Sequence, residues 1–232
     1  MIYNLFYVVF YYNMSLLPTT NSGYLELILG PMFSGKTSRL IEIYKKCEIT
    51  NISCIMINHS LDNRFTKKQE LISHDGKNVP CILLNNIYNY IYDNNTSEAS
   101  KLINSAKVIL INEGQFFDDI KESVLLLTEK FNKIVYVCGL DGDFKRNQFG
   151  KILNLIPYCD NIIKLPSLCK ICQDGTHALF SHRIDKSLCQ KLVGGKDEYI
   201  PLCRKCYLEN NLTINVPYNS STKNPCSSIA PR

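Results

Sequence analysis

Short hydrophobic runs recur along the chain and alternate with longer amphipathic segments. The hydrophobic pattern predicts helices at 38–46, 97–105 and 118–130, and strands at 24–29, 53–58, 80–84, 107–111 and 134–138. The runs at 107–111 and 134–138 are apolar at nearly every position, which indicates strands buried on both faces. Such strands alternating with helices predict an α/β fold, in which helices cover both faces of a parallel sheet.

Polar residues mark the expected starts of two of these helices. Ser97 opens the segment 97–105, and the acidic pair Asp118 and Asp119 opens the segment 118–130. Carboxylates stabilise the positive end of a helix, so the acidic pair is expected to cap the helix that follows it. Ligands of parallel sheets bind at the carboxyl ends of the strands, so candidate functional residues are sought in the loops after the strands.

The composition is that of a globular protein with one main domain and a small addition. The chain has 232 residues, 45% of them hydrophobic and 20% charged, and a formal net charge of +5. This charge is smaller than that of a dedicated nucleic-acid-binding protein. Eleven cysteines, an odd number without the spacing of a small disulfide framework, favour a reducing compartment.

The two ends of the chain differ from the middle. Residues 2–12 are apolar and uncharged, but they lack the charged start and cleavage site of a secretory signal and are shorter than the ~20 residues of a membrane span. We expect residues 1–20 to be a flexible or partner-packed extension and not a membrane anchor, with Met14 as a candidate start that N-terminal sequencing would test. Residues 208–232 are polar and are predicted to be disordered.

The segment that follows the first predicted strand fits the phosphate-binding loop pattern G-x-x-x-x-G-K-[ST] at every fixed position. Backbone N–H groups of such a loop, and the start of the helix behind it, bind phosphate oxygens. Lys36 is expected to reach the β- and γ-phosphates of a nucleotide and the Thr37 hydroxyl to bind Mg²⁺. The other expected phosphate-binding residues are Gly30, Pro31, Met32, Phe33, Ser34 and Gly35.

Two further loops follow predicted strands. Glu113 comes after the strand 107–111, where a carboxylate beside a phosphate-binding loop orients Mg²⁺ or a nucleophile. The loop 140–150 combines two glycines with aromatic and charged residues, and its aromatic rings are candidates for stacking on a base. Lys145 and Arg146 in this loop are candidates for facing phosphate.

Two C-x-x-C pairs, Cys169 with Cys172 and Cys203 with Cys206, suit a tetrahedral zinc site because each pair places two sulfurs on one turn. Four protein ligands leave no position for water, so the zinc would be structural. The alternative is four reduced structural thiols. The chain is accordingly divided into an α/β domain at 21–164 and a zinc-binding domain at 165–207.

Taken together, these segments resemble the zinc-containing thymidine kinases of cellular and poxvirus type, from about Tyr24 to Tyr207. The resemblance implies transfer of the γ-phosphate of ATP to the 5′-hydroxyl of thymidine, with Mg²⁺ and a structural Zn²⁺. It also implies a cytosolic homotetramer inhibited by thymidine triphosphate. The matching motifs are residues 30–37, Asp62-x-Arg64, 113–117, 140–144, Phe149-Gly150, both cysteine pairs, and Val193-Gly-Gly195 with Tyr199.

The resemblance also assigns roles to residues. Glu113 would be the general base, and Arg64 and Lys36 would stabilise the transferring phosphoryl group. The nucleotide and its metal would also contact Asp62, Asn63, Asn112 and Gln115. The nucleoside pocket would comprise Met32, Phe116, Leu140, Phe144, Phe149, Ser181, Gln190, Lys191, Leu192, Val193, Gly194 and Tyr199. Residues 190–194 would form a lasso whose backbone reads the thymine edge, with the zinc anchoring both of its ends.

Three positions depart from the family pattern. Asn112 replaces the usual Asp, which is expected to weaken the hold on the Mg²⁺ water shell and to lower the rate. Asp143 replaces Thr and is expected to add negative charge near the phosphate path. Ser181 replaces a Thr beside the thymine methyl, a loss of about 1 kcal/mol of contact that would relax selectivity against deoxyuridine.

Three alternatives remain open at the level of the sequence. One is a phosphate-loop ATPase acting on nucleic acid, with the cysteines as a binding ribbon; DNA-stimulated turnover would identify it. A second is a silent relative that only binds nucleotide, suggested by Asn112. The third is a broader kinase that accepts deoxycytidine or several deoxynucleosides, suggested by Ser181 and Asp143.

Overall fold

The computed structural model describes residues 22–62, 70–72, 78–92, 97–184 and 198–211. The N-terminal extension, the candidate start Met14 and the tail beyond residue 211 lie outside this part of the chain. Among the helices that the described ranges form, none combines the length and hydrophobicity needed to cross a bilayer.

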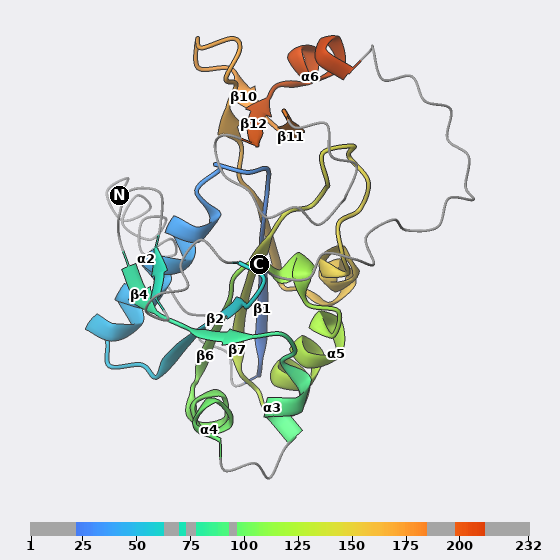
Figure 1. Cartoon of the computed structure of the whole chain (residues 1–232). Helices are drawn as coiled ribbons and strands as arrows, with labels where there is room; N and C mark the ends of the chain where they lie inside the picture. The colour runs from blue at the N-terminus through green and yellow to red at the C-terminus, as the bar shows by residue number, and fades with distance from the viewer. Residues whose placement is uncertain (1–21, 63–69, 73–77, 93–96, 185–197, 212–232) are drawn as a thin grey trace, which may run out of the picture.

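A six-stranded sheet forms the centre of the molecule, and all of its strand pairs are parallel. This arrangement confirms the predicted α/β fold (Figure 1). In spatial order the strands are β5 (Ile82–Leu84), β2 (Cys54–His59), β6 (Val108–Ile111), β7 (Ile134–Gly139), β1 (Tyr24–Leu29) and β8 (Asn161–Lys164).

Both faces of the sheet are covered by other elements. Alternate side chains of each buried strand point to opposite faces, so each strand contributes apolar side chains to two cores. The face with Leu27, Ile109 and Val135 packs against α3 (Tyr88–Tyr92), α4 (Glu98–Ser105), α5 (Ile120–Leu125) and η4 (Ile152–Tyr158). The face with Ile28 and Leu110 packs against α2 (Lys36–Ile49) and the hairpin of β3 (Glu70–Ile72) and β4 (Asn78–Pro80). The apolar runs are therefore continuous because they serve two cores.

The segment predicted as one helix at 118–130 is two elements. The α-helix α5 ends at Leu125 and continues as a π-helical turn, η3 (Leu126–Lys130). The predicted cap is wrong in detail: Asp119 stands at the start of α5, but its Oδ2 accepts hydrogen bonds from the N–H groups of Ile87 and Tyr88, both at 2.7 Å. The carboxylate thus ties the start of α3 to α5, since those donors from a distant part of the chain lie within reach. Ser97, in contrast, lies at the start of its helix as predicted, and its side chain caps α4 by accepting from the N–H of Ser100.

One strand prediction changes, and an edge strand of the central sheet was missed. The segment 80–84 is divided between two sheets, because β4 pairs antiparallel with β3 whereas β5 joins the central sheet. The edge strand β8 was not predicted. Its side chains are mostly exposed, so the segment lacks the long hydrophobic run that marks the buried strands.

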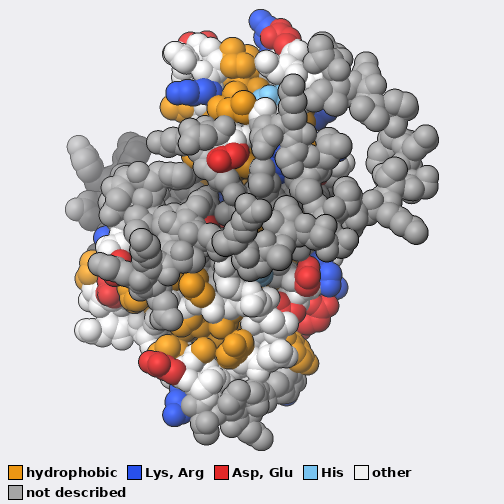
Figure 2. Space-filling model, viewed as in Figure 1, with side chains coloured by type: hydrophobic (Ala, Val, Ile, Leu, Met, Phe, Trp, Pro, Cys, Tyr) orange, Lys and Arg blue, Asp and Glu red, His pale blue; other side chains and the backbone are white. Residues whose placement is uncertain are grey.

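A small second unit, here called the cysteine module (residues 165–184 and 198–211), lies beyond the carboxyl edge of the sheet (Figure 1). It contains β9 (Ser167–Leu168), β10 (His177–Ala178), β11 (Phe180–Arg183), β12 (Tyr199–Leu202) and α6 (Arg204–Asn211). Helix α6 runs to Asn211, past the expected end of order at Tyr207. Hydrophobic side chains are visible on this module at the top of Figure 2, and Leu168 and Ile171 are among its exposed residues.

Candidate functional site

The phosphate-binding loop joins β1 to α2, as predicted. Gly30 has φ +147°, and a Cβ there would lie 2.3 Å from the carbonyl oxygen of Leu165, so glycine is required. Gly35, with φ +83°, stands in the left-handed conformation immediately before α2. Lys36 is largely buried, and its Nζ donates to the Pro31 carbonyl at 2.7 Å. The amine therefore lies over the loop at the positive end of the helix, where phosphate binds.

A chain of buried polar side chains connects this loop to the neighbouring strands. The Thr37 hydroxyl donates to Asn112 Oδ1 (3.3 Å), and Asn112 Nδ2 donates to Asn58 Oδ1 (2.9 Å). Asn58 Nδ2 in turn donates to Asp62 Oδ2 (3.3 Å). Asn58, Asp62 and Asn112 are each at most 1% exposed. Sequence reasoning missed Asn58; a polar residue near the end of a buried strand was the available signal.

This chain explains why an amide suits position 112. Asn112 both accepts and donates, whereas a carboxylate has no proton for Asn58 Oδ1. If the Asn58 amide turned to donate, its oxygen would face Asp62. We therefore expect Asn112→Asp to lower the free energy of unfolding by about 1–3 kcal/mol in urea denaturation at pH 7.

The exposed Asn154→Asp provides the control, because its Oδ1 accepts from Gln148 and a carboxylate can also accept. Unchanged stability of the Asn112 variant would contradict the expectation. Asn112→Asp also tests the prediction that Asn112 weakens the hold on the Mg²⁺ water shell. The added charge of the aspartate should lower the Mg²⁺ concentration needed for half-maximal ATP binding. An unchanged rate and Mg²⁺ requirement would show that prediction to be wrong.

Glu113 follows Asn112 at the end of β6 and has φ +53°, an unusual conformation for a residue with a side chain. Strained backbone of this kind is concentrated at functional sites. The Glu113 Oε2 accepts from Gln115 Nε2 at 2.6 Å, and Gln115 Oε1 accepts from the N–H of Leu140 at 3.0 Å. Gln115 therefore fixes the carboxylate relative to the loop after β7.

The expected pocket residues Phe116 and Phe149 meet in this region. Their rings are perpendicular with centroids 5.6 Å apart, and both side chains are buried. Gly150 follows with φ +60°, and a Cβ there would lie 2.0 Å from the Gln115 carbonyl oxygen. This contact explains why glycine follows Phe149, since a side chain would push the loop away from Gln115.

Asp143 has a local structural task that the sequence did not reveal. Its Oδ1 accepts from the N–H groups of Lys145 and Asn147, both at 2.8 Å. Such a side-chain-to-backbone turn shapes the loop itself. The carboxylate thus stabilises the tip of the loop, and the effect of its charge on the phosphate path stays a prediction.

The loop 140–150 is attached to the cysteine module through aromatic residues and cations. The Arg183 guanidinium lies 3.9 Å from the centroid of the Phe144 ring, and its Nε donates to the Tyr199 hydroxyl at 3.0 Å. The Tyr207 hydroxyl donates to the Phe144 carbonyl at 2.6 Å. Arg146 lies over the Tyr207 ring, 4.8 Å from its centroid.

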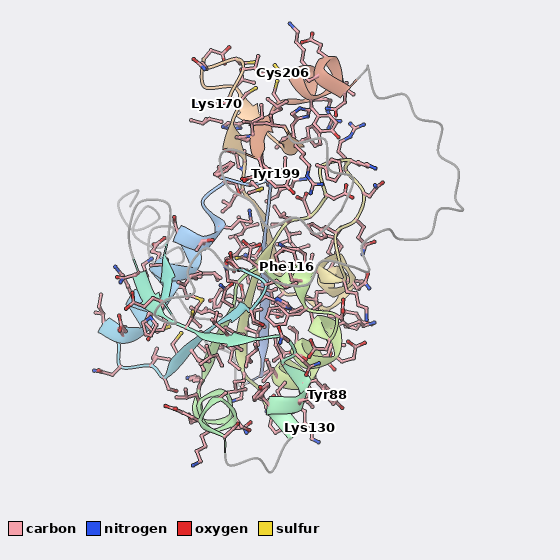
Figure 3. All side chains as sticks on the ribbon, viewed as in Figure 1. Tyr88, Phe116, Lys130, Lys170, Tyr199 and Cys206 are labelled. Atoms are coloured by element: carbon pink, nitrogen blue, oxygen red, sulfur yellow. The ribbon has the colours of Figure 1, made fainter. Side chains whose placement is uncertain are left out.

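Arg183 was missed by sequence reasoning, although a cation within an alternating strand opposite Tyr199 was a usable signal. It is 5% exposed. Burial raises the pKa of Tyr199, and the neighbouring Arg183 opposes that rise. Figure 3 shows Tyr199 between Phe116 at the sheet and Cys206 in the cysteine module. Arg183 therefore holds two expected pocket aromatics, Phe144 and Tyr199.

Ser181 lies on β11 of the cysteine module and contacts the phosphate-binding loop. Its Oγ accepts a hydrogen bond from the N–H of Met32 at 2.9 Å. A cavity of about 170 Å³ is lined by Ser181 and Phe180, by Asp143 and Arg146 of the loop 140–150, and by Pro31. The structure therefore brings Ser181, Met32 and the loop 140–150 together, as the sequence expected.

The four cysteines converge as predicted. Their sulfurs all lie within 4.8 Å of one another, and Cys172 Sγ is 3.8 Å from Cys203 Sγ and 3.5 Å from Cys206 Sγ. Ligands about 2.3 Å from a tetrahedral zinc lie about 3.8 Å apart, so this donor set fits Zn²⁺. Burial opposes ionisation of Cys169, but N–H groups of Cys172 and Cys203 lower the pKa of its thiol to about 6. Zinc binds the thiolate form, so these N–H groups favour the form of Cys169 that binds zinc, whereas the hydrogen bond with Cys172 raises the pKa of Cys206.

Several predicted site residues lie outside the described residues, so their roles stay predictions. They are Asn63 and Arg64 of the loop after β2, and the proposed lasso of Gln190, Lys191, Leu192, Val193 and Gly194.

Comparison with known proteins agrees with this geometry. The family model described as Thymidine kinase matches residues 23–207. The thymidine kinase of Yaba monkey tumor virus is 40% identical over 192 residues, covering 83% of this chain and 98% of that protein. Thymidine kinase a of Arabidopsis thaliana is 37% identical, covering 83% and 78% of the two chains. The thymidine kinase of Vaccinia virus (strain Western Reserve) is 37% identical, covering 82% and 99%. A phosphate-binding loop, a glutamate at the neighbouring strand end and a four-cysteine cluster thus occur in a chain that belongs to the thymidine kinase family.

Proposed function

We propose that this protein is a thymidine kinase that transfers the γ-phosphate of ATP to the 5′-hydroxyl of thymidine and forms thymidine monophosphate. The observation that carries the proposal is the position of Glu113. Its carboxylate follows β6, separated from the phosphate-binding loop of β1 by the single strand β7, at the same edge of the sheet. Family membership identifies the acceptor, which the geometry alone does not specify.

The loop 30–35 and the start of α2 bind the phosphates of ATP in this proposal. Lys36, which now donates to the Pro31 carbonyl, turns its amine to the β- and γ-phosphates. Thr37 and Asn112 hold the metal side of the nucleotide: the Thr37 proton is directed to Asn112, so the oxygen lone pairs of Thr37 are available to Mg²⁺. The cation supplies neutralisation of phosphate charge when bound.

Glu113 acts as the general base. Its carboxylate accepts the proton of the thymidine 5′-hydroxyl while that oxygen forms a bond to the γ-phosphorus and the bond to the β-phosphate oxygen breaks. Gln115 orients the carboxylate through its 2.6 Å hydrogen bond. In the proposal Arg64 stabilises charge on the transferring group.

The nucleoside binds between Phe116 and Phe149 on one side and the cysteine module on the other. Phe144 lies beside the base, held from behind by Arg183, and Tyr199 closes the site with the lasso. A structural Zn²⁺ on the four cysteines would hold β9 and β12 in place, and β12 pairs with β11, so that the strands before and after the lasso are both fixed.

The assembly and regulation follow the family in this proposal. The protein is expected to form a cytoplasmic homotetramer inhibited by thymidine triphosphate, the end product of the route that it feeds. Size-exclusion chromatography with light scattering and inhibition assays test these two statements.

The central experiment is ATP-dependent phosphoryl transfer to thymidine, with deoxyuridine and deoxycytidine in parallel. We expect thymidine to be phosphorylated fastest, with deoxyuridine retained as a slower substrate because Ser181 lacks the methyl group of threonine. Equal transfer to deoxycytidine would support the broader kinase. DNA-stimulated ATP hydrolysis without nucleoside phosphorylation would overturn the proposal.

A further inference from the structure

Two serines of the cysteine module are bonded to the backbone of the phosphate-binding loop. The Ser167 hydroxyl donates to the carbonyl of Phe33 at 3.0 Å, and Ser181 Oγ accepts from the N–H of Met32 at 2.9 Å. The two bonds hold consecutive residues of the loop: Ser167 donates to the carbonyl of Phe33, and Ser181 accepts from the N–H of Met32. Neither contact is made by a residue that binds phosphate in the proposed function.

The bonds to Met32 and Phe33 matter because the backbone of Phe33 is strained. Phe33 has φ +62°, a conformation that residues with a side chain rarely adopt and that costs of order 1–3 kcal/mol. The Ser167 bond holds the carbonyl of that same residue. Both serines are nearly buried, Ser167 at 8% and Ser181 at 5% exposure, so little water competes for these bonds.

A third contact comes from Leu165, the first residue of the cysteine module. The N–H of Leu165 donates to the Leu29 carbonyl at 2.8 Å. The Leu165 carbonyl oxygen lies so close to Gly30 that a Cβ on that residue would be only 2.3 Å from the oxygen. The first, third and fourth residues of the loop therefore all press against residues of the cysteine module.

The two serines are rigidly linked to the cysteine cluster. Ser167 lies two residues before Cys169 on β9, which pairs with β10. Ser181 lies opposite Pro201 of β12, whose last residue, Leu202, adjoins Cys203. Ser167 is thus connected to Cys169 along the chain, and Ser181 is connected to Cys203 through its strand partner Pro201.

We propose that Ser167 is a positioning residue, which together with Ser181 holds the phosphate-binding loop in the conformation that binds ATP, and that the cysteine module is its anchor. The inference rests on the proposed function, in which this loop binds ATP phosphates. In the proposed function the module then serves both substrates, because Tyr199 belongs to the expected nucleoside pocket and the two serines set the affinity for the nucleotide.

The physical mechanism is a population effect. Without the Ser167 bond the strained Phe33 backbone relaxes, and only a fraction of molecules present the loop correctly. The apparent Kd for nucleotide rises in inverse proportion to that fraction. Loss of one such hydrogen bond is expected to raise the Kd about fivefold, equivalent to ~1 kcal/mol.

The test compares Ser167→Ala with two other variants in the full-length, zinc-loaded protein. Ser167→Thr keeps the hydroxyl and should restore wild-type behaviour. Ser100→Ala is the matched control, because Ser100 is also buried and its hydroxyl donates to a backbone carbonyl, that of Tyr90, at 2.7 Å, far from the loop. Calorimetry measures Kd for ADP with Mg²⁺ in the absence of thymidine, and hydrogen exchange follows the peptide that contains residues 30–36.

For Ser167→Ala we expect the ADP Kd and the KM for ATP to rise about fivefold, with the KM for thymidine unchanged and faster exchange in the loop. Ser100→Ala should lower thermal stability without changing the ADP Kd. An unchanged ADP Kd in Ser167→Ala, or an equal rise in Ser100→Ala, would overturn the inference. Absence of ADP binding by the wild-type protein would overturn the proposed function itself, so the two failures are distinguishable.

Discussion

Replacement of Glu113 by glutamine is expected to lower kcat by about 10²–10⁴-fold, the range typical for loss of a general base. Glutamine has the same shape, and its amide oxygen can still accept the hydrogen bond from Gln115 Nε2. The fold, the ADP Kd and the thymidine Kd should therefore change little. Steady-state kinetics with thymidine, combined with calorimetry for both ligands, separate the chemical step from binding.

The matched control is Glu122→Gln on α5, which removes the charge of an exposed glutamate at a distance from the loop. Its kcat should equal that of the wild type. A Glu113 variant with more than half of the wild-type kcat would exclude this carboxylate as the base. A large loss of ADP binding in that variant would instead assign Glu113 to the metal side of the nucleotide.

Replacement of Cys203 by serine is expected to have the second large effect. Structural zinc contributes on the order of 10 kcal/mol to the folding of small domains, and a hydroxyl is a poor substitute for a thiolate. We expect zinc to be lost, the apparent melting temperature to fall, and thymidine phosphorylation to drop at least tenfold. The reason is that β12 ends at Leu202, next to Cys203, and begins at Tyr199, a residue of the proposed nucleoside pocket.

Zinc content by atomic absorption and the melting curve with and without chelator measure this outcome. Cys159→Ser is the control, because Cys159 lies outside the four-cysteine cluster. Its thiol donates to the Ile156 carbonyl at 3.2 Å, a bond that a serine hydroxyl can also make. A wild-type protein that contains no zinc and is insensitive to chelator would favour four reduced structural thiols. Retention of zinc and activity by the Cys203 variant would contradict the proposed ligand set.

The parts of the site that sequence analysis identified are those with a short-range signature. The phosphate-binding loop is eight consecutive residues, and its flanking strand and helix have their own periodicities. Each C-x-x-C pair forms one local turn. Glu113 was found because it ends a buried strand, and the parallel sheet brings such strand ends to one edge.

Other parts required contacts between residues far apart in the chain. Asn58 became a candidate only when Asn112 was seen 2.9 Å away, and Arg183 only when its guanidinium was seen on the Phe144 ring. Asp143 and Asp119 each have acidic side chains whose role depends on which N–H groups lie within reach. Such partners have no fixed spacing in the sequence.

The sequence by itself therefore determined the alternating α/β pattern, the phosphate-binding loop, the candidate base and the four cysteines. Hydrophobic periodicity and local ligand geometry act over a few residues, so they can be read along the chain. The tertiary structure decided the order of the strands and the chain of buried polar side chains from Thr37 to Asp62. It also decided the attachment of the phosphate-binding loop to Ser167 and Ser181. Those features arise where packing brings distant donors and acceptors within hydrogen-bonding distance, and burial then makes each pairing obligatory.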